Sequence, residues 1–467
     1  MSMSSQGHPR RWLILAVICL AQLTVLLDNT ILNVAIPSLT RELGATTSDI
    51  QWMINAYSLV QSGLLLTAGS TADRYGRKKM LATGLALFGI GSVVAGFATT
   101  STQLIAARAG MGVGGALLLT TTLAVAMQIF TPEEQPRAIG IWAAVNALGF
   151  ATGPLIGGFM LNHFWWGAIF LINLPVAALA LAAVAALVPE SKNPQGDRPD
   201  LLGAVLSTVG MASLVFAIIS GPAHGWTSSR VLVSAAVAVV VLALFAYWES
   251  RIPYPMLDLG FFRDRGFTGA VAGAVLITFG MSGALFLLTQ HLQFVLGYGP
   301  LEAGLRTAPL ALTVVLLNFS GVAAKLTARL GAPRAVLASM VVMSGGLVSI
   351  ATTGEAYAGT AAGLVLIGIG CAVANPAMAH AIMKAIPPAK AGVGAGINGT
   401  LAEFGNGLGV AVLGAVLSSS VASGKSLSTA LGVGQAVGAV AVLLGGAVAA
   451  GLLRRADRAE QKSVLAA

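Results

Sequence analysis

Residues 26–37 read Leu26-Leu27-Asp28-Asn29-Thr30-Ile31-Leu32-Asn33-Val34-Ala35-Ile36-Pro37 and place a carboxylate inside a segment that is otherwise apolar enough to cross a membrane. An ionised Asp near the bilayer centre costs roughly 3 kcal/mol on insertion scales, so an acid in a spanning helix points to a function. Asn29, Thr30 and Asn33 add hydrogen-bonding groups that suit the wall of a polar cavity. Two alternatives stay open for Asp28: a neutral structural acid, or a position near the outer interface. Pro37 is expected to end the helix.

The composition of the whole chain is typical of a membrane protein. Hydrophobic residues make up 56% of the 467 residues and charged residues 9%, whereas a soluble domain carries roughly 25% charged residues. Cys19 and Cys371 both lie in apolar runs, which predicts buried small side chains and no disulfide framework.

Repeated apolar runs of about 20 residues predict an all-α polytopic membrane protein with fourteen transmembrane helices. We expect these helices at 12–36, 49–69, 79–99, 102–127, 136–160, 165–188, 200–220, 230–248, 267–291, 302–323, 334–353, 357–380, 391–417 and 430–453.

A degenerate repeat divides these helices into two halves. Ala328–Arg334 lines up with Asp73–Lys79 through an Arg, a Gly and a final basic residue, and internal repeats of this kind are typical of transporters. The predicted organisation is a cytoplasmic N-terminus (1–11), an N-terminal six-helix half (12–188), a cytoplasmic linker (189–199), two inserted helices (200–248), a cytoplasmic loop (249–266), a C-terminal six-helix half (267–453) and a cytoplasmic tail (454–467).

The net charge of +9 reflects membrane orientation. All but five of the 26 Lys and Arg residues fall in alternate loops, the exceptions being Arg41, Arg108, Arg230, Arg306 and Lys425. By the positive-inside rule this pattern places both termini in the cytoplasm, and it argues against a nucleic-acid partner.

The loop after the second span contains a candidate gate. A short loop on the positive side would be basic for topology alone, which is the alternative explanation. Gly69 and Asp73 indicate more, because a small residue permits close helix approach and an acid at a helix end can pair with a neighbouring basic group. We interpret Gly69, Asp73, Arg74, Gly76 and Arg77 as a latch.

The fifth span combines glycines with a proline. Gly149, Gly153 and Gly157 recur every four residues and form one smooth face, followed by Gly158, while Pro154 can bend the helix. The combination favours a helix that seals a pathway.

Two further charges lie deep in the predicted spans. Arg108 needs an anionic or carbonyl partner at its depth, and Asp28 is the obvious candidate; the alternative is an Arg108 that extends to the outer interface. Glu403 is the second deep carboxylate, and it could instead be a packing residue bonded to Asn398 or Asn406. Polar residues expected to line a substrate cavity are Asn33, Asn55, Tyr57, Gln61, Asn146, Asn318 and Asn398.

Several of these motifs resemble those of the major facilitator superfamily, and specifically its fourteen-helix drug:proton antiporter family. The resembling stretches are Leu27–Pro37, Gly69–Lys79, Arg108–Gly115, Gly149–Gly158, Phe170–Pro175, Leu257–Arg263 and Gly299–Leu305. The resemblance implies that Asp28 is a coupling acid and that Arg108 is its proton-relay partner. The family commonly has a Gln three residues after this Arg, whereas this chain has Met111.

The resemblance implies a multidrug or antibiotic exporter of the plasma membrane that uses the proton gradient, with no cofactor and no metal. Protons, a lipophilic and often cationic small molecule and membrane lipid would be its partners, and we expect a monomer. Separation and approach of Asp28 and Arg108 would let the acid bind and release a proton. An importer or symporter, an exporter of an endogenous metabolite, and a non-transporting sensor remain alternatives. Nothing in the sequence points to an enzyme, since it has no Gly-rich phosphate loop ending in Gly-Lys-Ser/Thr and its histidines are scattered.

Overall fold

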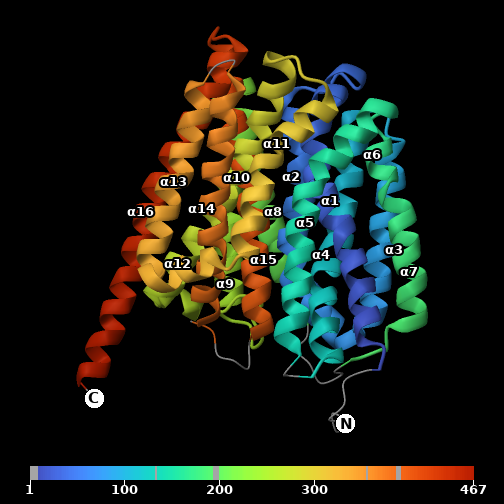
Figure 1. The fold of residues 1–467 in the computed structure, drawn as a ribbon, viewed down its shortest axis with the longest axis vertical. Helices are drawn as coiled ribbons and strands as arrows, with labels where there is room; N and C mark the ends of the chain where they lie inside the picture. Colours follow the sequence, from blue (N-terminus) through green and yellow to red (C-terminus); the bar gives the residue numbers. More distant parts are fainter. Residues whose placement is uncertain are drawn as a thin grey trace.

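The chain forms a bundle of long, roughly parallel α-helices (Figure 1). The computed structural model describes residues 9–131, 134–192, 199–353, 356–384, 386 and 391–466. Within these residues, twelve helices are long and apolar enough to cross a membrane. Both termini lie at the same end of the bundle, which we call the terminal end (Figure 1).

The N-terminal bundle comprises the first seven helices, of which two short ones share a single crossing. Their bounds are α1 (Arg11–Glu42), α2 (Thr47–Tyr75), α3 (Arg77–Gly96), α4 (Ser101–Ile129), α5 (Gln135–His163), α6 (Ala168–Leu171) and α7 (Asn173–Leu187). The helices α2 and α5 are 29 residues long and lie beside the twelve apolar helices. The prediction that Pro37 ends the first helix is wrong, since α1 continues to Glu42. A proline removes one backbone donor, and Thr40 Oγ1 supports the following turn by donating to Ile36 O at 3.0 Å.

Two inserted helices, α8 (Leu201–His224) and α9 (Ser229–Glu249), follow the N-terminal bundle and lead through a short 3₁₀ turn, η1 (Leu259–Arg263), to the next helix. The helix α8 packs against α9, against α2 and against α15 of the C-terminal bundle. Leu59 of α2, Val215 and Ile219 of α8 and Ala411 of α15 form one buried apolar cluster. The inserted pair therefore covers a junction between the two bundles.

The C-terminal bundle comprises the remaining helices. Their bounds are α10 (Arg265–Gln290) with its π-helical extension η2 (His291–Val295), α11 (Pro300–Phe319), α12 (Val322–Leu330), α13 (Ala332–Thr352), α14 (Tyr357–Lys384), α15 (Ala391–Ala422) and α16 (Leu427–Ala466). The helix expected at 302–323 ends earlier, because Gly321 adopts a left-handed φ of 69° that starts the separate helix α12.

Helix caps and small residues explain why these segments pack as they do. Asp49 and Thr46 form a capping box at the start of α2, and Asp200 and Asp264 cap α8 and α10. Close approach of α3 and α4 depends on Gly84, where a Cβ would lie 3.1 Å from Gly114 O.

Cys19 and Cys371 are buried and free, as predicted.

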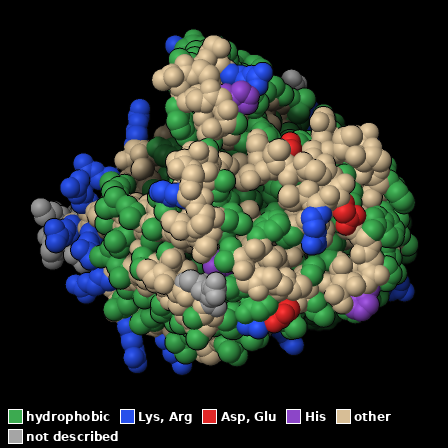
Figure 2. All heavy atoms as spheres, turned by 90° about the horizontal axis from the view of Figure 1, so that it is seen from above, with side chains coloured by type: hydrophobic (Ala, Val, Ile, Leu, Met, Phe, Trp, Pro, Cys, Tyr) green, Lys and Arg blue, Asp and Glu red, His purple; other side chains and the backbone are tan. Residues whose placement is uncertain are grey.

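The end opposite the termini has few basic side chains on its face. Figure 2 shows this end with scattered charges among polar atoms; hydrophobic side chains lie around much of the edge, and Lys and Arg side chains project at its left side. Three of the five exceptional basic residues lie at helix ends or connections here: Arg41 near the end of α1, Arg230 at the start of α9, and Lys425 between α15 and α16.

Candidate functional site

An ion pair between Asp28 of α1 and Arg108 of α4 lies in the core of the N-terminal bundle. Arg108 Nη1 donates to Asp28 Oδ2, and Arg108 Nε donates to the carbonyl oxygen of Met53 on α2 at 3.0 Å. The two residues are 2% and 1% exposed, so neither side chain reaches the surface of the protein. The guanidinium joins three helices through two directed hydrogen bonds.

Tyr57 of α2 covers the guanidinium of Arg108. The Arg108 Cζ atom lies 4.3 Å from the centre of the Tyr57 ring, an arrangement in which the ring face attracts the cation. A Cβ on Gly115 of α4 would lie 2.7 Å from the Tyr57 hydroxyl oxygen and 3.1 Å from Gln61 Nε2. The absence of a side chain at Gly115 therefore makes room for both polar groups.

Asn173 of α7 is a site residue that the sequence analysis missed. It is 1% exposed, lies close enough to Asp28 to interact with its carboxylate, and donates to Ser92 Oγ of α3 at 3.5 Å. The sequence does contain a signal for this residue, because an Asn inside an apolar run needs a buried hydrogen-bond partner. Asp28 thus has contacts from both α4 and α7.

Glu403 of α15 lies on the other side of the junction between the bundles. It is 8% exposed, and Asn406 and Ser58 of α2 lie close enough to interact with its carboxyl group, whose Oε2 atom is buried without a hydrogen-bond partner. No ion pair involves Glu403 within the part of the chain that the structure describes. Tyr57 is buried and lies within electrostatic range of both Asp28 and Glu403.

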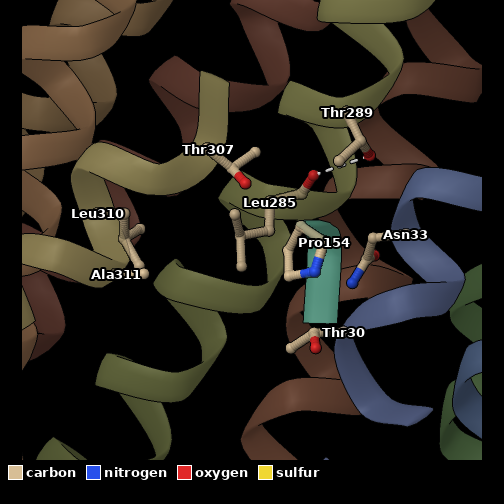
Figure 3. A pocket seen from close by; sticks show the side chains of 8 residues that line it. All are labelled: Thr30, Asn33, Pro154, Leu285, Thr289, Thr307, Leu310 and Ala311. Carbon is tan, nitrogen blue, oxygen red and sulfur yellow. Dashed lines mark hydrogen bonds between the residues drawn. The ribbon is translucent and has the colours of Figure 1, made fainter. Parts of the chain in front are cut away.

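Asn33 lines a small cavity between the two bundles (Figure 3). Thr30 and Asn33 approach from α1, Pro154 from α5, Thr289 from α10 and Thr307 from α11. The cavity volume is about 10 Å³, which is close to the minimum for one water molecule. Asn33 Oδ1 is buried and has no hydrogen-bond partner. The bundles are therefore closed against each other at this level.

The other predicted cavity residues do not gather around an open cavity. Asn55, Tyr57 and Gln61 are 0% exposed and pack between helices in this conformation, because α2 is in close contact with both α4 and α15. Asn398 is partly buried on α15, and Asn318 is exposed near the end of α11. The side chain of Asn146 lies outside the described residues.

The predicted latch residues connect α2, α3 and α4 at the terminal end. Arg77 Nη2 lies 2.7 Å from Asp73 Oδ1, and Arg77 Nη1 donates to Ala124 O of α4 at 3.3 Å. Gly76 has a φ of 119° between α2 and α3, a conformation that favours glycine. Arg74 lies in the last turn of α2. The close approach expected at Gly69 is absent, since a Cβ there would lie 4.0 Å from Thr120, an ordinary van der Waals distance.

The glycines of α5 form two contact faces. Gly149, Gly153 and Gly157 face Leu26, Thr30 and Ile31 of α1, in that order. Gly158 faces α11, where a Cβ would lie 2.6 Å from both Pro300 O and Leu301 Cα. The helix α5 is therefore held between α1 of its own bundle and α11 of the other.

The described fold agrees with the comparisons to known proteins. The family model Major Facilitator Superfamily matches residues 18–410. Multidrug resistance protein Stp of Mycobacterium tuberculosis is 37% identical over 84% of this chain and 73% of its own length. Multidrug efflux pump LfrA of Mycolicibacterium smegmatis is 35% identical over 94% of this chain and 87% of its own. Methyl viologen resistance protein SmvA of Salmonella typhimurium is 36% identical over 90% and 86%.

Solved structures share the architecture at low sequence identity. The POT family transporter PepTSo has a TM-score of 0.71 at 14% identity, covering 97% of this chain and 99% of that chain. The chain belongs to the Major Facilitator Superfamily, and within it to the family of multidrug efflux proteins. It is a multi-pass membrane protein of a transporter family.

Proposed function

We propose that this protein is a proton-coupled antiporter that exports drugs or antibiotics across the plasma membrane by alternating access. The observation that carries the proposal is the buried ion pair of Asp28 and Arg108, with Glu403 as a second buried acid across the junction. Buried charges are costly unless they are paired, and those retained inside a spanning helix mark functional sites. Asp28 and Arg108 lie in the N-terminal bundle, and Glu403 lies on α15 of the C-terminal bundle.

Fourteen crossings form part of the proposal. The helices α2 and α5 are as long as their neighbours and contact helices of both bundles, so we count them with the twelve apolar helices. An even number of crossings agrees with the two termini lying at the same end. The concentration of Lys and Arg at this end supports a cytoplasmic location for both termini. The N-terminal six-helix half then corresponds to α1–α7 and the C-terminal half to α10–α16. The inserted pair corresponds to α8 and α9.

In this mechanism the proton and the drug use the acids alternately. With the ion pair closed, Arg108 neutralises Asp28, and Glu403 holds the proton. Rearrangement of α1 against α4 separates Asp28 from Arg108 and lets the acid take up a proton from the outer side. One elementary charge that crosses the membrane contributes about 2.3 kcal/mol per 100 mV, which favours export.

The gate residues support alternating access. Contacts of Gly158 with Leu301 and of Pro154 with Gly304 join α5 to α11 toward the end opposite the termini. We assign these contacts to the outer gate and the Asp73–Arg77 pair to an inner latch. In this conformation the outer gate is closed.

The relatives support lipophilic and cationic substrates. SmvA is named for resistance to methyl viologen, a dication, whereas other relatives from Streptomyces are named for tetracenomycin C and puromycin. A cation can compete with a proton for a carboxylate, and Tyr57 offers an aromatic face. We propose a monomer that uses protons and membrane lipid as partners and needs neither a nucleic acid nor a cofactor.

Drug uptake into inverted vesicles tests the proposal. An imposed gradient, acidic inside, should drive accumulation of methyl viologen or ethidium, and an ionophore that collapses the gradient should abolish it. Accumulation that persists without a gradient would contradict proton coupling. Movement with the proton instead of against it would indicate a symporter, and no movement of any cationic or neutral antibiotic would favour the sensor alternative.

A further inference from the structure

A second pair of buried acids lies at the terminal end of the inserted helices. Asp200 caps the start of α8, and Glu249 is the last residue of α9. They are 6% and 3% exposed. Neither residue belongs to the site of Asp28, Arg108 and Glu403, and no step proposed above uses them.

Most oxygen atoms of the pair have a hydrogen-bond donor. Asp200 Oδ1 accepts from Gly203 N at 2.9 Å and from Trp248 Nε1 at 3.0 Å, and Asp200 Oδ2 accepts from the same indole at 3.1 Å. Glu249 Oε2 accepts from Leu257 N at 3.0 Å. The pair thus connects α8, α9 and the segment 250–258.

The remaining oxygen, Glu249 Oε1, is buried and receives no hydrogen bond from a protein donor. It faces Asp200 across Gly203: a Cβ on Gly203 would lie 2.7 Å from Glu249 Oε1 and would also overlap Asp200 Oδ2. Asp200 and Glu249 therefore lie next to each other and within electrostatic range. Two carboxylates cannot hydrogen-bond to each other unless one of them carries a proton.

No cation compensates the pair within the described residues, where neither acid takes part in an ion pair. From α2 the facing group is Thr67, which is uncharged and donates to Asp200 O at 3.3 Å. Beyond α9, Arg251 lies over the ring of Tyr247, and Asp258 accepts from Gly260 N. Farther along α2, Asp73 pairs with Arg77. Two ionised acids in this setting would repel each other at low effective dielectric.

We propose that Asp200 and Glu249 share one proton and form a second proton-binding site, separate from the Asp28–Arg108 pair. The proton lies on Glu249 Oε1 and is donated to Asp200 Oδ2. Release of this proton to water leaves two adjacent carboxylates. Their repulsion separates α8 from α9 and frees the segment around Leu257. Because Thr67 bonds to the Asp200 backbone, the change reaches α2, a helix of the junction between the bundles. This inference does not depend on drug export.

Infrared spectroscopy of the purified protein in lipid nanodiscs tests for the proton directly. The background is the double variant Asp28→Asn/Glu403→Gln, so that the main site contributes no protonated carboxyl group. We expect a carbonyl band of a buried carboxylic acid that shifts in D₂O and disappears as the pH rises. Adding Glu249→Gln should remove the band, whereas adding the exposed control Glu302→Gln should leave it. A band that survives Glu249→Gln, or no band at any pH, would overturn the proposal.

Limited trypsin digestion tests the structural consequence, with cleavage at the exposed residues Arg251, Arg263 and Arg265 as the readout. In the wild type, cleavage should accelerate as the pH rises, after correction for trypsin activity on a model peptide. Glu249→Gln can still accept from Leu257 N and can donate to Asp200, so its cleavage should stay slow and independent of pH. Equal pH dependence in both proteins would contradict the proposal. Suppression of wild-type cleavage by Na⁺ or K⁺ at high pH would show a metal-cation site instead of a proton-binding site.

Discussion

Arg108 on α4 donates to Asp28 on α1 and to the backbone of Met53 on α2, and both charged side chains are almost completely buried. The pair is electrically neutral as long as it stays closed. Any movement that separates α1 from α4 leaves both charges without their partner: a proton can neutralise Asp28, whereas Arg108 keeps its charge and must reach water or another acceptor. This relationship makes the pair a conformational switch and leads to the first prediction.

Arg108→Ala should destabilise the protein by about 3–5 kcal/mol, because it leaves Asp28 buried without its cation. The double variant Asp28→Asn/Arg108→Gln should recover much of this loss, since it removes both charges. Thermal unfolding of the purified proteins measures both effects. Arg306→Ala is the matched control: Arg306 forms a partly exposed pair with Glu302, and such pairs contribute little. Equal losses for Arg108→Ala and the double variant would show that the charge pairing is not the cause.

Glu403→Gln should weaken the pH dependence of drug binding. A proton and a cationic drug compete for the same carboxyl group, so the apparent Kd of the wild type for ethidium should fall as the pH rises. In Glu403→Gln this competition is absent at α15, and the Kd should change less with pH. Fluorescence titrations at several pH values measure the difference. An unaltered pH profile would exclude Glu403 from proton–drug competition.

Gly158→Val should open the outer gate. A Cβ at Gly158 would lie 2.6 Å from Pro300 O and Leu301 Cα, so a branched side chain must push α11 away from α5. Spin labels at Phe164→Cys and Gly299→Cys should report a longer distance in this variant. Gly110→Val serves as the control, because a Cβ at Gly110 meets no atom within 4 Å. The same distance distribution in both variants would contradict the assignment of this contact as the gate.

Arg77→Ala should slow transport and leave drug binding almost unchanged. Arg77 at the start of α3 connects Asp73 of α2 with Ala124 O of α4 at the terminal end, away from the Asp28–Arg108 pair. Its loss should shift the balance between conformations. The maximal rate of vesicle uptake and the Kd of the detergent-purified protein separate the two effects. Lys79→Ala removes the same charge from an exposed position in the same segment. If both variants transport equally slowly, the loss of positive charge would explain the result and the latch would not.

The sequence contained enough information to predict the helical bundle and the pairing of Asp28 with Arg108. Both follow from a strong constraint: hydrocarbon excludes unpaired backbone groups and unpaired charges. The pairing of Glu302 with Arg306 follows from their spacing of four residues on one helix. The glycine face of α5 toward α1 was also predictable, because small residues repeated every four positions lie on one side of a helix and permit close packing.

Other features depend on tertiary contacts that no local pattern reveals. Tyr57 and Gln61 were expected in a cavity, yet they fill the space left by Gly115 of α4. The position of α8 over α2 and α15 depends on which apolar surface the inserted pair covers, and all its faces are similarly apolar in sequence. Gly321 interrupts a helix that hydropathy alone predicts as continuous.

Drug-triggered proton release from the purified protein tests the central claim, that Asp28 couples drug binding to proton movement. In weakly buffered detergent solution with a pH indicator, adding methyl viologen or ethidium to the wild type should release protons. Asp28→Asn should release fewer protons at saturating drug, whereas the exposed control Asp457→Asn should match the wild type. Release from Asp28→Asn equal to that of the wild type would contradict the coupling role of Asp28.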